Sequence, residues 1–207
     1  MVIRTILSNF GQMNRNFSYI RRITGIIKRT GIRDMWLKDK LFGNKKKQET
    51  FTLCIPEETL AILETADLEG HKALMVINQA LKDHQDDSDM KQVFCYYCSI
   101  IFNFIDVDDN MWPSSEEFAI MRDYVETFDK GLKGLPEHPN ALFVARVTHK
   151  GTCQMIWMLH DAQTAVKYLD EIIAKGNEVR DFEYHIEGDP QWKSIEWFLQ
   201  DFPTKDQ

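Results

Sequence analysis

The segment from Val93 to Ile105 constrains the fold most, because apolar and mixed positions alternate along its whole length. One set of alternate positions is entirely apolar or aromatic: Phe94, Tyr96, Cys98, Ile100, Phe102 and Phe104. Successive side chains of a strand point to opposite faces of a sheet, so this period of two predicts a strand with one buried face. The chain must therefore build a sheet and cover at least one side of it.

A helix and a β-hairpin are predicted to follow this strand. Ser114, with Glu117 three residues later, forms a capping box that marks the start of a helix. The hairpin is predicted from two apolar runs, 141–148 and 152–159, on either side of the turn residues Lys150-Gly151.

The remaining elements complete a recognisable order. Asp161 is placed to cap a second helix, and residues 182–187 alternate as a half-exposed strand. Asp189-Pro190 predicts the start of a C-terminal helix, because Pro suits the first helical position. The order over residues 92–207 predicts an α+β, ferredoxin-like βαββαβ two-layer sandwich with both central helices on one face of an antiparallel sheet.

Residues 51–91 are predicted to form a separate helical pair. Apolar residues recur there at helical spacing, first as Leu60, Leu63 and Ala66, then as Leu74, Ile77 and Leu81. Pro56 suits the first turn of the first helix. We expect this N-terminal helical pair and the C-terminal helix to cover part of the sheet face that the central helices leave open.

Charge is divided unevenly along the chain. Residues 1–49 hold 12 Lys+Arg and 3 Asp+Glu, whereas the remainder holds 13 Lys+Arg and 29 Asp+Glu. The acidic body repels phosphates, so we expect it to bind no nucleic acid. It suits a basic protein partner, or simply solubility. With 4 Cys and no long apolar run, we expect a reduced, cytoplasmic protein without a transmembrane segment.

Residues 1–50 are expected to form a basic segment, disordered or partly helical. Its only helical pattern puts isoleucines on one face and places four basic residues largely outside it: Arg21, Arg22, Lys28 and Arg29. Such a segment can lie on a membrane surface, serve as a transit peptide or contact nucleic acid. The alternative is that the natural protein starts at Met35.

Arg146 and Thr148 are candidate binding residues in the first hairpin strand. Regular alternation places them on one face beside Leu142 and Val144. A guanidinium on a sheet surface can hold the carboxylate of a partner. It can equally pair with an acidic residue inside the domain, Glu183 or Asp189, and we favour this internal pair.

Glu183, His185 and Trp192 are the other candidate binding residues. Glu183 and His185 share a strand face with Glu187, and such a trio can bind a metal or act as acid and base. Alternation alone explains the trio as a solvated face. Trp192 follows the predicted cap of the last helix and is interpreted mainly as a core residue.

No cofactor or metal is expected. Cys95 and Cys98 have the spacing of a redox or zinc pair, but in a strand an odd separation of three sends their sulfurs to opposite faces. No second cysteine pair completes a zinc site, and the chain contains neither a phosphate-binding glycine loop nor a nucleophile elbow.

From Trp112 to Phe202 the chain resembles the family called domain of unknown function 695. Three stretches carry the likeness: Ser115-Glu116-Glu117-Phe118; Phe143-Val144-Ala145-Arg146-Val147-Thr148 with Gly151; and Phe182 to Ile186 with Asp189-Pro190-Gln191-Trp192 and Phe198-Leu199. The family usually has Gly where this chain has Ala145. Its hairpin is often basic and then aromatic, unlike residues 153–158 here.

The resemblance implies a bacterial, cytoplasmic protein without a known activity. Some relatives are fused to a ribonuclease-regulator domain, which implies regulation through protein binding. We therefore expect a non-catalytic protein-binding or regulatory domain. The alternative is a small hydrolase or metal-dependent enzyme that uses Arg146, Glu183 and His185 on the polar face of the sheet.

Overall fold

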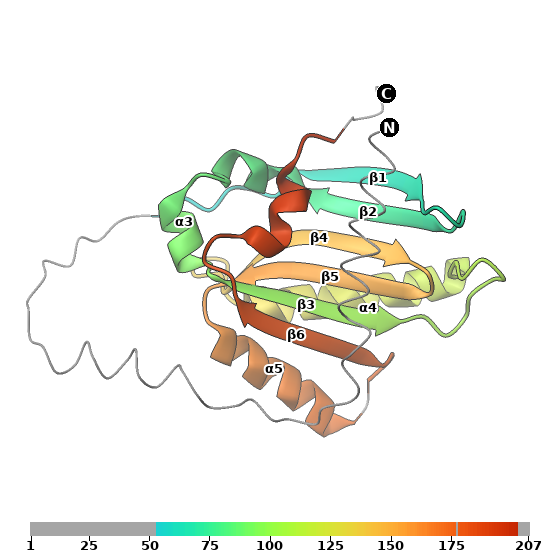
Figure 1. Cartoon of the computed structure of the whole chain (residues 1–207). Helices are drawn as coiled ribbons and strands as arrows, with labels where there is room; N and C mark the ends of the chain where they lie inside the picture. The colour runs from blue at the N-terminus through green and yellow to red at the C-terminus, as the bar shows by residue number, and fades with distance from the viewer. Residues whose placement is uncertain (1–52, 177, 203–207) are drawn as a thin grey trace, which may run out of the picture. The chain divides into compact units, whose positions relative to one another are not determined.

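This computed structural model describes residues 53–176 and 178–202, which form six strands and five short or long helices (Figure 1). With η marking a 3-10 helix, the elements are β1 (Leu60–Ala66), β2 (Lys72–Asn78), η1 (Gln79–His84), α3 (Ser88–Val93), β3 (Tyr96–Asn103), α4 (Ser115–Lys133), β4 (Ala141–His149), β5 (Thr152–Leu159), α5 (Ala162–Lys175), β6 (Phe182–Gly188) and η2 (Lys193–Leu199). The predictions for the basic segment and for Met35 lie outside the described residues.

The strands form one six-stranded sheet with the order β1-β2-β4-β5-β3-β6. All neighbouring strands are antiparallel. The predicted order of strand, helix, strand, strand, helix, strand is present from β3 to β6. The fold is therefore mixed α and β, and the β1–β2 hairpin extends the sheet beyond β4.

The helical pair predicted for residues 51–91 is wrong. The residues with helical spacing lie mostly in β1 and β2, and helical structure is confined to η1 and α3. The physical reason lies in β4, which is buried along nearly its whole length. Such a strand needs neighbours on both sides, since an exposed edge would leave its backbone unpaired, and β2 supplies the second neighbour.

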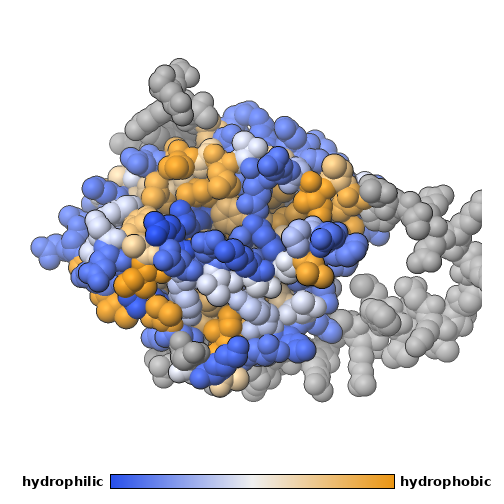
Figure 2. All heavy atoms as spheres, turned by 180° about the vertical axis from the view of Figure 1, so that it is seen from behind, coloured by the Kyte–Doolittle hydropathy of each residue, from blue (hydrophilic) through white to orange (hydrophobic). Residues whose placement is uncertain are grey.

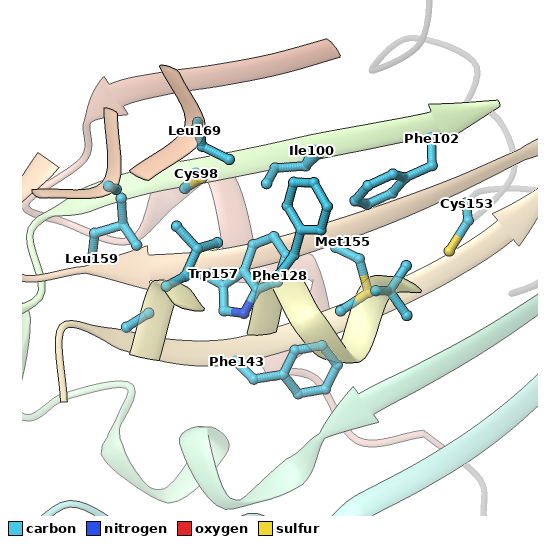
Figure 3. Packing of buried hydrophobic residues seen from close by; sticks show 14 of the residues in the cluster. Cys98, Ile100, Phe102, Phe128, Phe143, Cys153, Met155, Trp157, Leu159 and Leu169 are labelled. Carbon is cyan, nitrogen blue, oxygen red and sulfur yellow. The ribbon is translucent and has the colours of Figure 1, made fainter. Parts of the chain in front are cut away.

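Helices α4 and α5 cover one face of the sheet, which we call the helix face. Their buried residues pack against β3, β4 and β5 around fully buried aromatic side chains: Phe102, Phe128 and Trp157 (Figure 3). The capping residue Ser114 accepts a hydrogen bond from Glu117 N, as predicted (3.2 Å). The carboxylate of Glu117, however, accepts from Ile105 N and pairs with Arg180 instead of closing the capping box.

The C-terminal segment covers part of the opposite face, where η2 lies against β4 and η1 (Figure 1). Its apolar side chains are buried: Trp192, Ile195, Phe198 and Leu199. The helix predicted from Asp189 is shorter than expected, because the Asp189 carboxylate accepts from Lys193 N and Ser194 N and the 3-10 turns begin only there. No helix of the described ranges has the length and hydropathy needed to cross a membrane.

Candidate binding groove

A β-bulge in β4 determines where Arg146 lies. The pairing with β5 shifts from Phe143–Trp157 to Ala145–Ile156, so Val144 is the extra residue. Arg146 therefore pairs with Met155, whose side chain belongs to the helix-face core. A one-residue shift reverses the alternation of a strand, which explains why Arg146 and Thr148 do not share a face with Leu142, as regular alternation predicted.

Asn78 holds the bulge in place. The pairing of β2 with β4 ends at Ile77–Ala145, and the Asn78 side chain then donates from Nδ2 to the carbonyl of Phe143 (3.0 Å). Its Oδ1 accepts from the backbone N–H groups of Thr59 and Ala80, both at 3.2 Å. Asn78 is only 3% exposed, so these bonds satisfy polar groups that water does not reach.

A groove of about 260 Å³ opens on the helix face between α4 and the β1–β2 hairpin. We call it the α4–β1 groove, and it is lined by Glu58, Leu60, Val76, Arg122, Val125, Glu126, Asp129, Phe143, Arg146 and Met155. Figure 2 views the molecule from this side and shows apolar surface gathered around a hollow. On β1, Leu60 is 53% exposed and Ile62 is 71% exposed, and both lie on this face.

The carboxylates that line the α4–β1 groove already have cationic partners. Lys133 Nζ lies 2.7 Å from Glu58 and 2.6 Å from Asp129. Asp129 also accepts from the indole N–H of Trp157 at 2.8 Å, and Glu126 pairs with Lys130 at 2.7 Å. Burial alone would lower the pKa of Lys133, but its bonds to Asp129 and Glu58 outweigh burial and raise that pKa.

Arg146 differs from these groups because its guanidinium has no partner in the part of the chain that the structure describes. Within residues 53–176 and 178–202, it forms neither an ion pair nor a hydrogen bond. The predicted internal pair is therefore wrong. Glu183 pairs with Ile101 and lies on the opposite face, and the Asp189 carboxylate is engaged with backbone amides. Among the described residues, Arg146 is thus a half-buried cation of the groove with no acidic side chain within ion-pair distance.

The other candidate residues lie elsewhere. Glu183 and His185 occupy the face opposite to Arg146, and His185 Nε2 lies 3.3 Å from Glu187. The three residues of the enzyme hypothesis therefore do not converge in one cleft. Trp192 is 1% exposed and donates to the carbonyl of Phe94 at 2.7 Å, so it is a core residue that no partner can reach in the folded state. Thr148 is buried beside the groove.

A polar cluster at the tip of the β1–β2 hairpin was missed by the sequence analysis. Ligand-type atoms of Asp67, Glu69 and His71 lie within 4.8 Å of one another. Lys150 occupies this cluster, at 2.9 Å from Asp67 and 2.6 Å from Glu69, and His149 Nε2 lies 3.1 Å from Asp67. The arrangement ties the hairpin tip to the β4–β5 turn, and the lysine supplies the charge that a cation would bring.

The cysteines predicted to be structural have no disulfide among the described residues. Cys98 and Cys153 are buried on the helix face, and burial raises the pKa of each thiol to about 12. Burial also raises the pKa of Cys95. Thiols with raised pKa values are poor nucleophiles and poor metal ligands, since both roles need the thiolate.

The fold and the groove define an α+β domain with an open groove on the helix face of its sheet. The chain belongs to the family of unknown function DUF695, whose model matches residues 63–200. This match begins inside β1, so the family region includes the second half of β1 and all of β2, together with the resemblance from Trp112 up to residue 200. A search of curated proteins and a search of solved structures each found no match.

Proposed function

We propose that this protein is a non-catalytic module that binds another protein through the α4–β1 groove. The observation that carries the proposal is the exposure of Leu60, which lines the groove, and of Ile62, which lies on the same face of β1 and pairs with the groove residue Val76. Contiguous apolar surface at a concave site is typical of a protein-contact surface, whereas scattered exposed side chains are not.

Three further properties belong to this proposal. We propose that β3 to β6 with α4 and α5 form a ferredoxin-like unit to which the β1–β2 hairpin is added. Support comes from the strand order, since each helix connects two strands with one other strand between them. The strongly acidic body supports a protein partner rather than a nucleic acid. The resemblance to the family supports a bacterial, cytoplasmic protein.

Capture of partners from the native host by cross-linking and mass spectrometry tests the proposal. The baits are the full chain, its Ile62→Lys variant and a matched control, Ile173→Lys. Ile173 is also exposed (48%), but it lies on α5, which does not line the groove. We expect the native bait and the control bait each to capture one protein in stoichiometric amount. The yield of that protein with the Ile62→Lys bait should be lower by about tenfold or more. Equal yields from all three baits would refute the proposal.

A further inference from the structure

The unpartnered guanidinium of Arg146 is the feature of the α4–β1 groove that selects a ligand. Arg146 is half-buried and lies among Val76, Phe143 and Met155. Electrostatic attraction is stronger beside low-dielectric surface than in bulk water. A guanidinium in such a place binds a carboxylate through two parallel hydrogen bonds, which makes this pair stronger and more specific than a neutral contact.

The surrounding charges limit the type of anion. Glu58, Glu126 and Asp129 line the same groove; Glu126 pairs with Lys130, whereas Glu58 and Asp129 share Lys133. Two lysines therefore compensate three carboxylates, and the remaining negative charge repels a ligand in proportion to the ligand's own negative charge. A phosphate, which carries more charge than one carboxylate, would be repelled more strongly than a monoanion that pairs with Arg146. The groove therefore favours a monoanionic carboxylate.

The apolar surface limits what carries the carboxylate. Leu60 and Ile62 are exposed on β1 along one side of the groove, and Val125 of α4 lines the other. A small hydrophilic acid would leave these side chains in water. An apolar peptide segment covers these side chains and removes their apolar surface from water. This is favourable by roughly 25 cal/mol for each Å² of surface removed.

We propose that the α4–β1 groove binds an apolar segment of a partner protein that carries one Asp or Glu, whose carboxylate accepts hydrogen bonds from the guanidinium of Arg146. This inference rests on the proposed function and adds the chemistry of the partner. Arg146 is the anchor that selects the acidic side chain, and the apolar rim binds its neighbours.

Selection from a random peptide library displayed on phage, with the immobilised full chain as target, tests this inference. We expect the enriched peptides to combine apolar residues with one Asp or Glu. The strongest peptide is then synthesised with amidated C-terminus, together with a version in which Asp or Glu is replaced by Asn or Gln. Titration calorimetry should show that this replacement weakens binding to the native chain about tenfold, equivalent to about 1.4 kcal/mol.

Three variants identify the anchor. Arg146→Met should bind both peptides equally and weakly, and Arg146→Lys should recover only part of the discrimination, because lysine lacks the planar fork. Lys167→Met is the matched control, since Lys167 is an exposed cation on α5, outside the groove lining. It should retain about the native discrimination. Thermal unfolding of each variant confirms that it is folded before binding is measured.

Several outcomes would overturn the inference. Enriched peptides without an acidic residue, or equal discrimination by the native chain and Arg146→Met, would show that Arg146 is not the anchor. If Ile62→Lys abolishes partner capture while Arg146→Met does not, the proposed function stands and the carboxylate chemistry is wrong. If no enriched peptide competes with the captured partner, the proposed peptide chemistry is wrong, and the capture yields with Ile62→Lys and Ile173→Lys alone decide the proposed function. If only peptides with a free C-terminal carboxylate bind, the guanidinium binds that terminus, and the proposed Asp or Glu side chain is wrong.

Discussion

Glu117 and Arg146 are both partly or fully buried charged residues, but they differ in whether an oppositely charged side chain pairs with them. Glu117 is 2% exposed, and its carboxylate accepts from Arg180 Nε at 2.7 Å, from Arg180 Nη2 at 2.5 Å and from Ile105 N at 3.0 Å. The bonds from Arg180 lower the pKa of Glu117. Arg146 is also partly buried but has no such partner within residues 53–176 and 178–202, and the proposed function gives its charge the role of binding a ligand.

Replacing Glu117 with Ala should destabilise the fold by about 3 kcal/mol, because Arg180 and the Ile105 N–H would lose a buried acceptor. Urea unfolding followed by circular dichroism measures the change. The control is Glu126→Ala, since Glu126 pairs with Lys130 at an exposed site, and its loss should cost less than about 0.5 kcal/mol. Equal costs for both variants would contradict the structural role of Glu117.

At the scale of elements, the bulge in β4 depends on one buried amide. Asn78→Ala should lower the free energy of unfolding by about 2 kcal/mol, since it leaves the Phe143 carbonyl and two N–H groups without partners. Asn103 is exposed in β3 and provides the control, for which a change below about 0.5 kcal/mol is expected. Amide exchange at Ala145 and Arg146 should also accelerate in Asn78→Ala; protection at native level would show that the bulge does not need Asn78.

The polar cluster at the tip of the β1–β2 hairpin should make the free energy of unfolding depend on pH in the acidic range. Hydrogen bonds from Lys150, His149 and the backbone outweigh burial and hold the pKa of Asp67 well below its ordinary value of 3.8. A lowered carboxyl pKa adds stability that is fully present above the unfolded value and is lost as pH falls below it.

Asp67→Asn should therefore be less stable than the native protein near neutral pH, and the difference should shrink as pH falls below about 3.8. Urea unfolding at a series of pH values measures it. The Asn side chain keeps an oxygen that can accept hydrogen bonds from the backbone N–H groups of Glu69 and His71. The comparison therefore isolates the contribution of the Asp67 charge to stability. A difference that stays constant with pH would contradict this account.

Most elements could be predicted from local sequence, and the exceptions have a common cause. The alternation in β3, the capping residues Ser114 and Asp161 and the turn at Gly151 all act within a few residues. The residues of β1 and β2 fit helical spacing as well as strand spacing, and only pairing with the distant β4 decides between them. Arg146 is a candidate binding residue from the sequence, and its face depends on a bulge that alternation does not reveal.

At the scale of the whole molecule, the short C-terminal segment completes the cover of the second sheet face. Removing residues 189–207 would delete four buried side chains: Trp192, Ile195, Phe198 and Leu199. Their burial contributes on the order of 8 kcal/mol, which is comparable to the net stability of a domain.

The truncated chain should lose its near-ultraviolet circular dichroism and bind the dye ANS, because apolar surface of the sheet would be exposed. The variant Phe198→Ala should show a smaller loss of about 4 kcal/mol and keep a cooperative transition. A truncated chain that unfolds cooperatively at the native midpoint would show that η2 is dispensable.

The bulge at Val144 has a consequence for how this surface can evolve. A regular ladder that kept Val144 would pair Arg146 with Gln154 instead of Met155 and send the guanidinium to the other side of the sheet. Deleting Val144 would instead remove the extra residue and leave the guanidinium on the helix face, opposite Met155. A shortening of β4 by one residue at the bulge is therefore compatible with the same groove, whereas an unbulged strand of the present length is not.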